Sequence, residues 1–135
     1  PLLIDYFFAG KLTVSKFKTD KFEKVVNHTF VIRNEGNKVV TNIEIEIQKL
    51  EGSKILLIGE TKGIKIDEPK PLYKLSNNIK SEKVFLTIAR LVSKDYIAVT
   101  IQQPIKLYNS FNNITKKVSF PRINNAISDQ GNALR

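Results

Sequence analysis

The chain contains no cysteine and only one histidine, His28, among its 135 residues. The absence of cysteine excludes disulfide bonds, thiolate zinc sites, iron–sulfur clusters and cysteine nucleophiles. A single imidazole cannot form a two-histidine metal site, and neither a glycine-rich phosphate-binding motif nor a serine-nucleophile motif occurs. We therefore expect no catalytic residues, no metal, no cofactor and no enzymatic activity.

Long apolar runs and methionine are also missing. No run approaches the ~18 apolar residues of a membrane-spanning helix, and no basic-then-apolar signal segment is present. Because the chain starts at Pro1 and has no methionine, we interpret it as a piece of a longer protein. Lysine, isoleucine and asparagine make up more than a third of the residues, a bias typical of an AT-rich genome, which suggests a bacterial source.

The residues that are present carry a strand pattern of period two. In residues 39–48, Ile43, Ile45 and Ile47 alternate with polar and charged residues. Such alternation is typical of a strand with one buried face and one exposed face. We expect these isoleucines to share a core with Phe30, Ile32, Leu86, Ile88, Val99 and Ile101. The other predicted strands are residues 11–17, 27–33, 55–58, 63–66, 84–89, 97–101 and 117–120.

Short strands separated by turn residues predict an all-β fold, an immunoglobulin-like antiparallel β-sandwich of roughly seven to nine strands. Residues 34–37, Asn-Glu-Gly-Asn, form a turn between two alternating runs, which are joined either as a hairpin or as a sheet-to-sheet connection. We expect residues 1–123 to form this one domain. Residues 124–135 are polar and are predicted to be a tail or linker.

Two stretches resemble bacterial immunoglobulin-like modules and are similar to the cell-adhesion-related domain found in bacteria. The first, in residues 28–45, places Asn34-Glu35-Gly36 between two strands, and the second, in residues 88–101, runs from Leu91 through a turn into a strand. Family members usually have Pro-Gly in the second turn, where this chain has Ser93-Lys94. The resemblance covers about half of the chain and implies a non-catalytic spacer or binding domain.

The net charge of +9 is unevenly distributed: +3 in residues 1–38, −2 in residues 39–68 and +8 in residues 69–135. In the last segment, basic and aromatic residues are interleaved, and they form a candidate patch for an anionic partner: Lys106, Tyr108, Phe111, Lys116, Lys117 and Arg122. Such mixtures bind nucleic acid through phosphate contacts and base stacking, and they also suit anionic cell-wall polymers or a membrane surface. The alternative is that the aromatic residues pack in the core and the lysines reflect genome composition.

These features predict a non-catalytic immunoglobulin-like module of a larger bacterial protein, which acts as a spacer or protein-binding domain at the cell envelope. The predicted location is extracytoplasmic or membrane-anchored rather than cytoplasmic. The alternative is an intracellular binding domain that engages an anionic partner (nucleic acid, cell-wall polymer or membrane surface) through its basic C-terminal half. A protein partner is favoured, an anionic polymer or membrane surface comes second, and nucleic acid comes last because no nucleic-acid-binding motif is present. His28 shares a strand face with Phe30 and Ile32 and is expected to be a partly buried structural residue.

Overall fold

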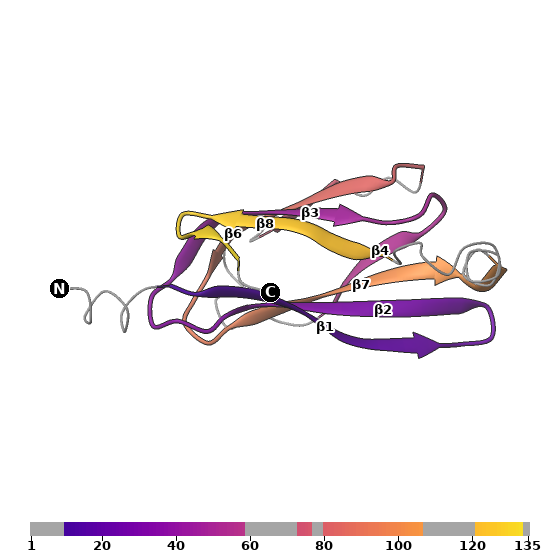
Figure 1. Ribbon diagram of the computed structural model, residues 1–135, viewed down its shortest axis with the longest axis horizontal. Helices are drawn as coiled ribbons and strands as arrows, with labels where there is room; N and C mark the ends of the chain where they lie inside the picture. The colour runs from indigo at the N-terminus through magenta and orange to yellow at the C-terminus, as the bar shows by residue number, and fades with distance from the viewer. Residues whose placement is uncertain (1–9, 59–72, 77–79, 107–120, 134–135) are drawn as a thin grey trace, which may run out of the picture.

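The computed structural model describes residues 10–58, 73–76, 80–106 and 121–133. Within these residues the chain forms nine β-strands, which Figure 1 shows as two layers. The strands are β1 (Leu12–Lys21), β2 (Val25–Asn34), β3 (Val40–Gln48), β4 (Lys54–Ile58), β5 (Tyr73–Leu75), β6 (Lys83–Leu91), β7 (Tyr96–Pro104), β8 (Arg122–Ser128) and β9 (Gly131–Asn132).

The strands form two sheets that pack face to face. Sheet A has four strands in the order β1-β2-β7-β4, and sheet B has five in the order β5-β6-β3-β8-β9. All pairings between these strands are antiparallel. The predicted all-β antiparallel sandwich is therefore confirmed.

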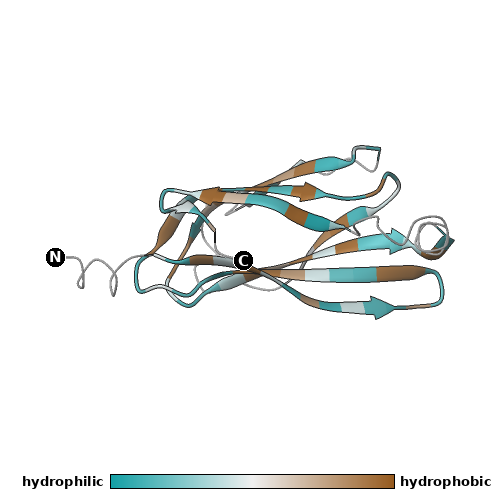
Figure 2. Ribbon diagram, viewed as in Figure 1, coloured by the Kyte–Doolittle hydropathy of each residue, from teal (hydrophilic) through white to brown (hydrophobic). Residues whose placement is uncertain are grey.

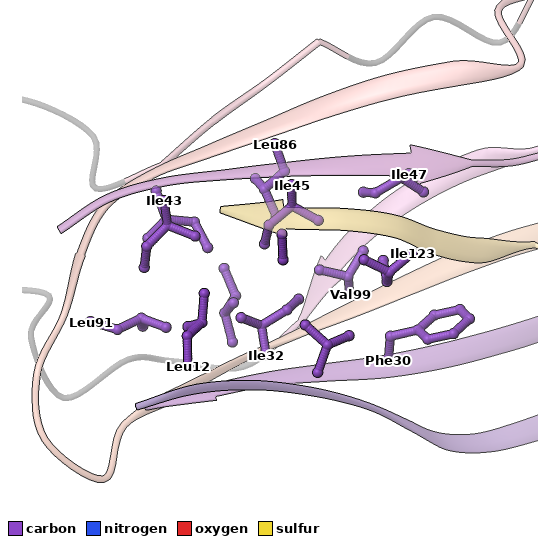
Figure 3. Close-up of a cluster of buried hydrophobic side chains, with 14 of the residues drawn as sticks. Leu12, Phe30, Ile32, Ile43, Ile45, Ile47, Leu86, Leu91, Val99 and Ile123 are labelled. Carbon is purple, nitrogen blue, oxygen red and sulfur yellow. The ribbon is translucent and has the colours of Figure 1, made fainter. Parts of the chain in front are cut away.

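Alternating apolar residues from both sheets fill the space between the layers. Ile43, Ile45 and Ile47 of β3 are each 0% exposed, and Ile45 lies opposite Leu86 of β6 on one side and Ala126 of β8 on the other. Figure 3 shows the three isoleucines of β3 pointing toward the facing sheet, and the brown and teal bands along the strands in Figure 2 follow the same alternation. The core residues predicted on the other strands all belong to this cluster: Phe30, Ile32, Leu86, Ile88, Val99 and Ile101.

Where a predicted strand lies within the described residues, the strand in the structure is generally longer than the predicted one. β1 continues to Lys21 and β7 to Pro104, beyond the predicted ends at residues 17 and 101. These extensions are polar, so apolar alternation does not mark them, but their backbone groups still pair with β2. The predicted strands at residues 63–66 and 117–120 lie outside the described residues.

The polar tail predicted from residue 124 onward is instead part of sheet B. β8 runs to Ser128 and pairs with β3, and β9 pairs back onto β8. Ile123 and Ala126 are 5% and 3% exposed and supply the apolar contacts that hold this otherwise polar strand against the core. The predicted boundary at residue 123 is therefore wrong for the described residues, which belong to the sandwich as far as Ala133.

Between β2 and β3 the chain crosses from sheet A to sheet B, so the two alternating runs are joined by a sheet-to-sheet connection. The fully buried side chain of Asn34 holds this crossing. Its Oδ1 accepts hydrogen bonds from the backbone N–H groups of Lys11 (3.2 Å) and Gly36 (3.0 Å). Its Nδ2 donates to the carbonyl groups of Lys38 (2.7 Å) and Leu91 (2.9 Å). One amide therefore joins β1, the crossing and the end of β6.

The two stretches that carry the family resemblance meet at this crossing. The backbone N–H of Asn34 donates to the carbonyl of Asp95 (2.9 Å), and the N–H of Lys94 donates to the carbonyl of Asn34 (2.8 Å). The Ser93 hydroxyl donates to the carbonyl of Gly36 (2.6 Å). Lys94 has φ 66°, in the left-handed region that favours glycine.

Both ends of the described chain lie at the same end of the sandwich, which we call the Gly10 end. Residues 10–12 and residues 128–132 border one shallow pocket of about 210 Å³, and a Cβ atom built on Gly10 would lie 3.2 Å from Cγ of Gln130. The β1–β2 turn lies at the opposite end, on the right in Figure 1.

Candidate functional site

The end of the sandwich opposite Gly10 collects basic side chains from both sheets. Because neighbouring strands run antiparallel, the ends of β1, β3 and β7 meet the starts of β2, β4, β6 and β8 there. Among the described residues, the exposed basic ones at this end, which we call the basic end, are Lys21, Lys24, Lys54, Lys80, Lys83, Lys106 and Arg122. The exposed acidic ones in the same described set are Glu23, Glu51 and Glu82. The excess of positive charge raises the local concentration of anions.

The β1–β2 hairpin adds aromatic side chains to the basic end. Phe17 and Phe22 are 66% and 53% exposed. Exposed lysines flank both rings along the hairpin: Lys16, Lys18, Lys21 and Lys24. We call residues 16–24 the aromatic–basic hairpin. Since burial of a phenylalanine side chain is worth about 1.5–3 kcal/mol, this surface suits a partner that is both apolar and anionic.

A β-bulge in β1 lies at the exposed Phe17. Lys16 and Lys18 pair with consecutive residues of β2, so Phe17 between them has no partner in the ladder. The ammonium Nζ of Lys18 lies 5.8 Å from the centroid of the Phe17 ring and 3.2 Å from Oδ2 of Asp20. These contacts hold a cation beside the ring on the outermost strand of sheet A.

Beneath the basic end, the interior of the sandwich changes from apolar to polar. His28 of β2 and Gln103 of β7 are 1% and 0% exposed, and His28 Nε2 lies 2.9 Å from Gln103 Oε1. Thr19 Oγ1 lies 3.5 Å from His28 Nδ1. Burial lowers the pKa of His28 below 6.5, and the charge of Lys16 acts in the same direction, while the hydrogen bond to Gln103 opposes both. A neutral ring that donates its Nε2–H to Gln103 fits this environment. The sequence predicts a partly buried His28, and the structure buries it fully.

The connection between β3 and β4 adds two more buried polar residues. Lys49 and Ser53 are 1% and 0% exposed. Burial lowers the pKa of Lys49 below 10.5, while the carboxylates of Glu51 and Glu82 act in the opposite direction. Ser53 Oγ and Gln103 Nε2 have no hydrogen-bond partner in the described part of the chain. Buried polar atoms without a partner are destabilising, so these two atoms oppose the stabilisation that the apolar core provides.

Two of the six residues predicted to bind an anionic partner lie within the described ranges. Lys106 follows β7 in sheet A, and Arg122 begins β8 in sheet B. Both are exposed at the basic end, and Arg122 Nε donates to Asn124 Oδ1 at 2.8 Å. The other four residues lie outside the described residues: Tyr108, Phe111, Lys116 and Lys117.

The sequence prediction did not include the aromatic–basic hairpin. Its signal is the dipeptide Lys-Phe, which occurs at residues 16–17 and again at residues 21–22. Summing charge over long segments hides this signal, because Asp20 and Glu23 reduce the net charge of the hairpin to +2. Strand alternation contains a further signal, because Phe17 lies an odd number of residues from Leu12 and Val14 and therefore falls on the opposite face of the strand.

Residues 10–58, 73–76, 80–106 and 121–133 contain no group of three or more histidine, aspartate or glutamate side chains arranged to hold a metal ion. Over the same ranges, no helix is long and apolar enough to cross a membrane. Models of known protein families do not match this chain, and no curated protein matches it. Proposals about function therefore rest on the fold and on the geometry of the basic end.

Proposed function

We propose that this domain is a non-catalytic immunoglobulin-like module of a larger bacterial protein, and that it acts as a protein-binding domain at the cell envelope. The observation that supports binding over a spacer role is that both described ends of the chain lie at the Gly10 end. A spacer in a linear array receives the chain at one end and releases it at the other. A domain held by one end instead presents its opposite end to partners.

The basic end has the features of such a presented surface. It is built from turns and strand ends of both sheets, and binding residues of sandwich domains commonly occupy such positions on a rigid scaffold. The continuous apolar core provides this scaffold without a cofactor. Fold alone does not determine function, so the location of the basic end is the argument for the proposal.

Oriented immobilisation tests this function. Because the chain has no cysteine, one introduced thiol gives a single attachment point. Asn132→Cys attaches the domain at the Gly10 end and leaves the basic end free, whereas Lys24→Cys attaches it at the basic end. We expect a defined protein from bacterial envelope extracts to bind the first form and not the second. Equal capture by both forms, or capture by neither, contradicts the proposal.

A second candidate function is binding of an anionic partner, which the clustering of exposed basic residues favours. Lys106 and Arg122 lie at the basic end, as an anionic-partner surface requires. We expect binding to an anionic polymer to weaken with added salt and to weaken in the Lys106→Gln/Arg122→Gln variant. The matched control is Lys11→Gln/Lys38→Gln, which removes two exposed lysines at the Gly10 end. Equal loss in both variants indicates a general charge effect and contradicts a localised surface.

A further inference from the structure

We propose that the aromatic–basic hairpin docks on an anionic lipid bilayer, with its two phenylalanines entering the headgroup region and its lysines contacting lipid phosphates. This inference rests on the second candidate function, binding of an anionic partner. It names the partner as a membrane surface and places the contact on β1 and the β1–β2 turn.

The position of the two rings supports insertion into an interface. β1 is an outermost strand of sheet A and has β2 as its neighbour, and Phe22 lies in the turn that follows β1. The side chains of Phe17 and Phe22 are 66% and 53% exposed on this edge hairpin. Such an exposed edge can enter the boundary between headgroups and acyl chains while the rest of the sandwich stays in water, and aromatic side chains bind readily there.

The charge of the hairpin matches an anionic membrane surface. Four lysines and two acidic residues give residues 16–24 a net charge of +2. The backbone N–H of Ile105 donates to the carbonyl of Lys24 at 2.9 Å, which places the exposed Lys106 next to the hairpin. Each lysine near an anionic bilayer strengthens binding about fivefold, and long lysine side chains can reach the phosphates while the rings lie deeper.

The same geometry disfavours two other anionic partners. A bulge and three lysines along β1 hinder the addition of an extended peptide strand to this edge. Single-stranded nucleic acid is held by bases that stack on aromatic ring faces. The Lys18 ammonium lies 5.8 Å from the centroid of the Phe17 ring and competes with a stacked base for that ring. Insertion of the ring into a lipid interface needs only its apolar surface and does not require that a ring face be free for stacking.

Tryptophan reporters test the inserted residues directly. The chain has no tryptophan, so Phe17→Trp and Phe22→Trp each give a single fluorescent probe. Phe85→Trp is the matched control, because Phe85 of β6 in sheet B is 53% exposed, like Phe22. With vesicles of phosphatidylcholine and phosphatidylglycerol, we expect a blue shift of both hairpin probes and no shift of the control. Vesicles of phosphatidylcholine alone should give no shift. No shift of the hairpin probes, or an equal shift of the control probe, overturns the proposal.

Vesicle co-sedimentation then separates this inference from the function on which it rests. We expect Phe17→Ala/Phe22→Ala to weaken binding by roughly 20-fold or more and Lys16→Gln/Lys24→Gln roughly 25-fold, with Phe85→Ala unchanged. Circular dichroism and thermal unfolding show whether each variant is folded. If only Lys106→Gln/Arg122→Gln weakens vesicle binding, the hairpin inference fails and the anionic-partner function stands. If the domain binds a labelled oligonucleotide and ignores vesicles, the lipid assignment is wrong. If it binds neither, the lipid inference fails, and the anionic-partner function fails as well unless the domain binds an anionic cell-wall polymer in the same assay.

Discussion

Replacement of Asn34 is the most direct test of how the two sheets are held together. Its buried amide accepts two hydrogen bonds and donates two, and it thereby joins β1, the crossing from β2 to β3 and the end of β6. Asn34→Ala removes all four bonds at once. Two carbonyl groups and two N–H groups then lose their partner in the region where the chain changes sheets.

The expected loss follows from the burial of these groups. A buried polar group left without a partner costs about 1–3 kcal/mol. The bond to the carbonyl of Leu91 is fully buried, whereas the partners on Lys11, Gly36 and Lys38 are partly buried and can be hydrated in part. We therefore expect Asn34→Ala to lower the free energy of unfolding by about 3–5 kcal/mol. This is a large fraction of the roughly 5–15 kcal/mol that stabilises a typical domain.

Asn34→Asp separates the donor bonds from the acceptor bonds. The aspartate keeps one accepting oxygen but places a second oxygen against the carbonyl groups of Lys38 and Leu91. Burial and these carbonyls raise the pKa of the new carboxyl in the folded state, so the folded protein binds its proton more tightly than the unfolded chain does. The free energy of unfolding should therefore rise as the pH is lowered through this folded-state pKa, and Asn34→Ala should not show that rise.

Urea denaturation with an unchanged m-value is the appropriate assay. Asn125→Ala is the control, because Asn125 is exposed on β8, and its effect should stay within about 0.5 kcal/mol. If Asn34→Ala is as mild as this control, the amide does not hold the crossing. An Asn34→Asp variant as stable as the parent at neutral pH would refute the assignment of the two donor bonds.

Three further predictions concern the core, the buried histidine and one strained turn. Ile45→Ala should lower the free energy of unfolding by about 2–5 kcal/mol and lower the melting temperature sharply. Glu44→Ala, on the exposed face of the same strand, should change this free energy by less than about 0.5 kcal/mol. Equal effects would mean that the strand faces are assigned wrongly. The pKa of His28 is lowered in the folded state, so as the pH falls below 6.5 the unfolded chain takes up a proton before the folded protein does. The free energy of unfolding, measured by urea titration, should therefore decrease below this pH, and the His28→Leu variant should not show the decrease. Lys94→Gly should raise the free energy of unfolding by up to about 1 kcal/mol, because φ 66° strains a residue with a side chain but not glycine. Lys94→Ala keeps this strain and is the control. An equal gain from alanine in the same denaturation assay would argue against this reason.

The sequence by itself determined which residues face the core on the regular strands. Side chains of a strand alternate between its faces whatever its neighbours are, so the period-two pattern around Ile45 identified a buried face before any partner strand was known. The same local rule placed His28 on the buried face of β2. The fold class followed from these patterns, because several half-buried strands with short turns can bury their apolar faces only by packing sheet against sheet.

Which sheet each strand joins was decided by the tertiary structure. The turn at residues 34–37 was compatible with a hairpin as well as with a crossing. The crossing is held by the bonds from Asn34 to Lys38 and Leu91, and Leu91 is 57 residues away along the chain. A contact at such a separation leaves no periodic signal in the local sequence.

A bulge accounts for the part of the C-terminal strand that the sequence did not reveal. In β8, the pairing with β3 skips Asn124, so Ile123 and Ala126 both face the core although their spacing of three residues breaks the strand period. A second bulge, in β1, lies at the exposed Phe17 beside Lys18. The position of a bulge depends on the hydrogen-bond register between two strands. This register is defined only when the two strands are paired.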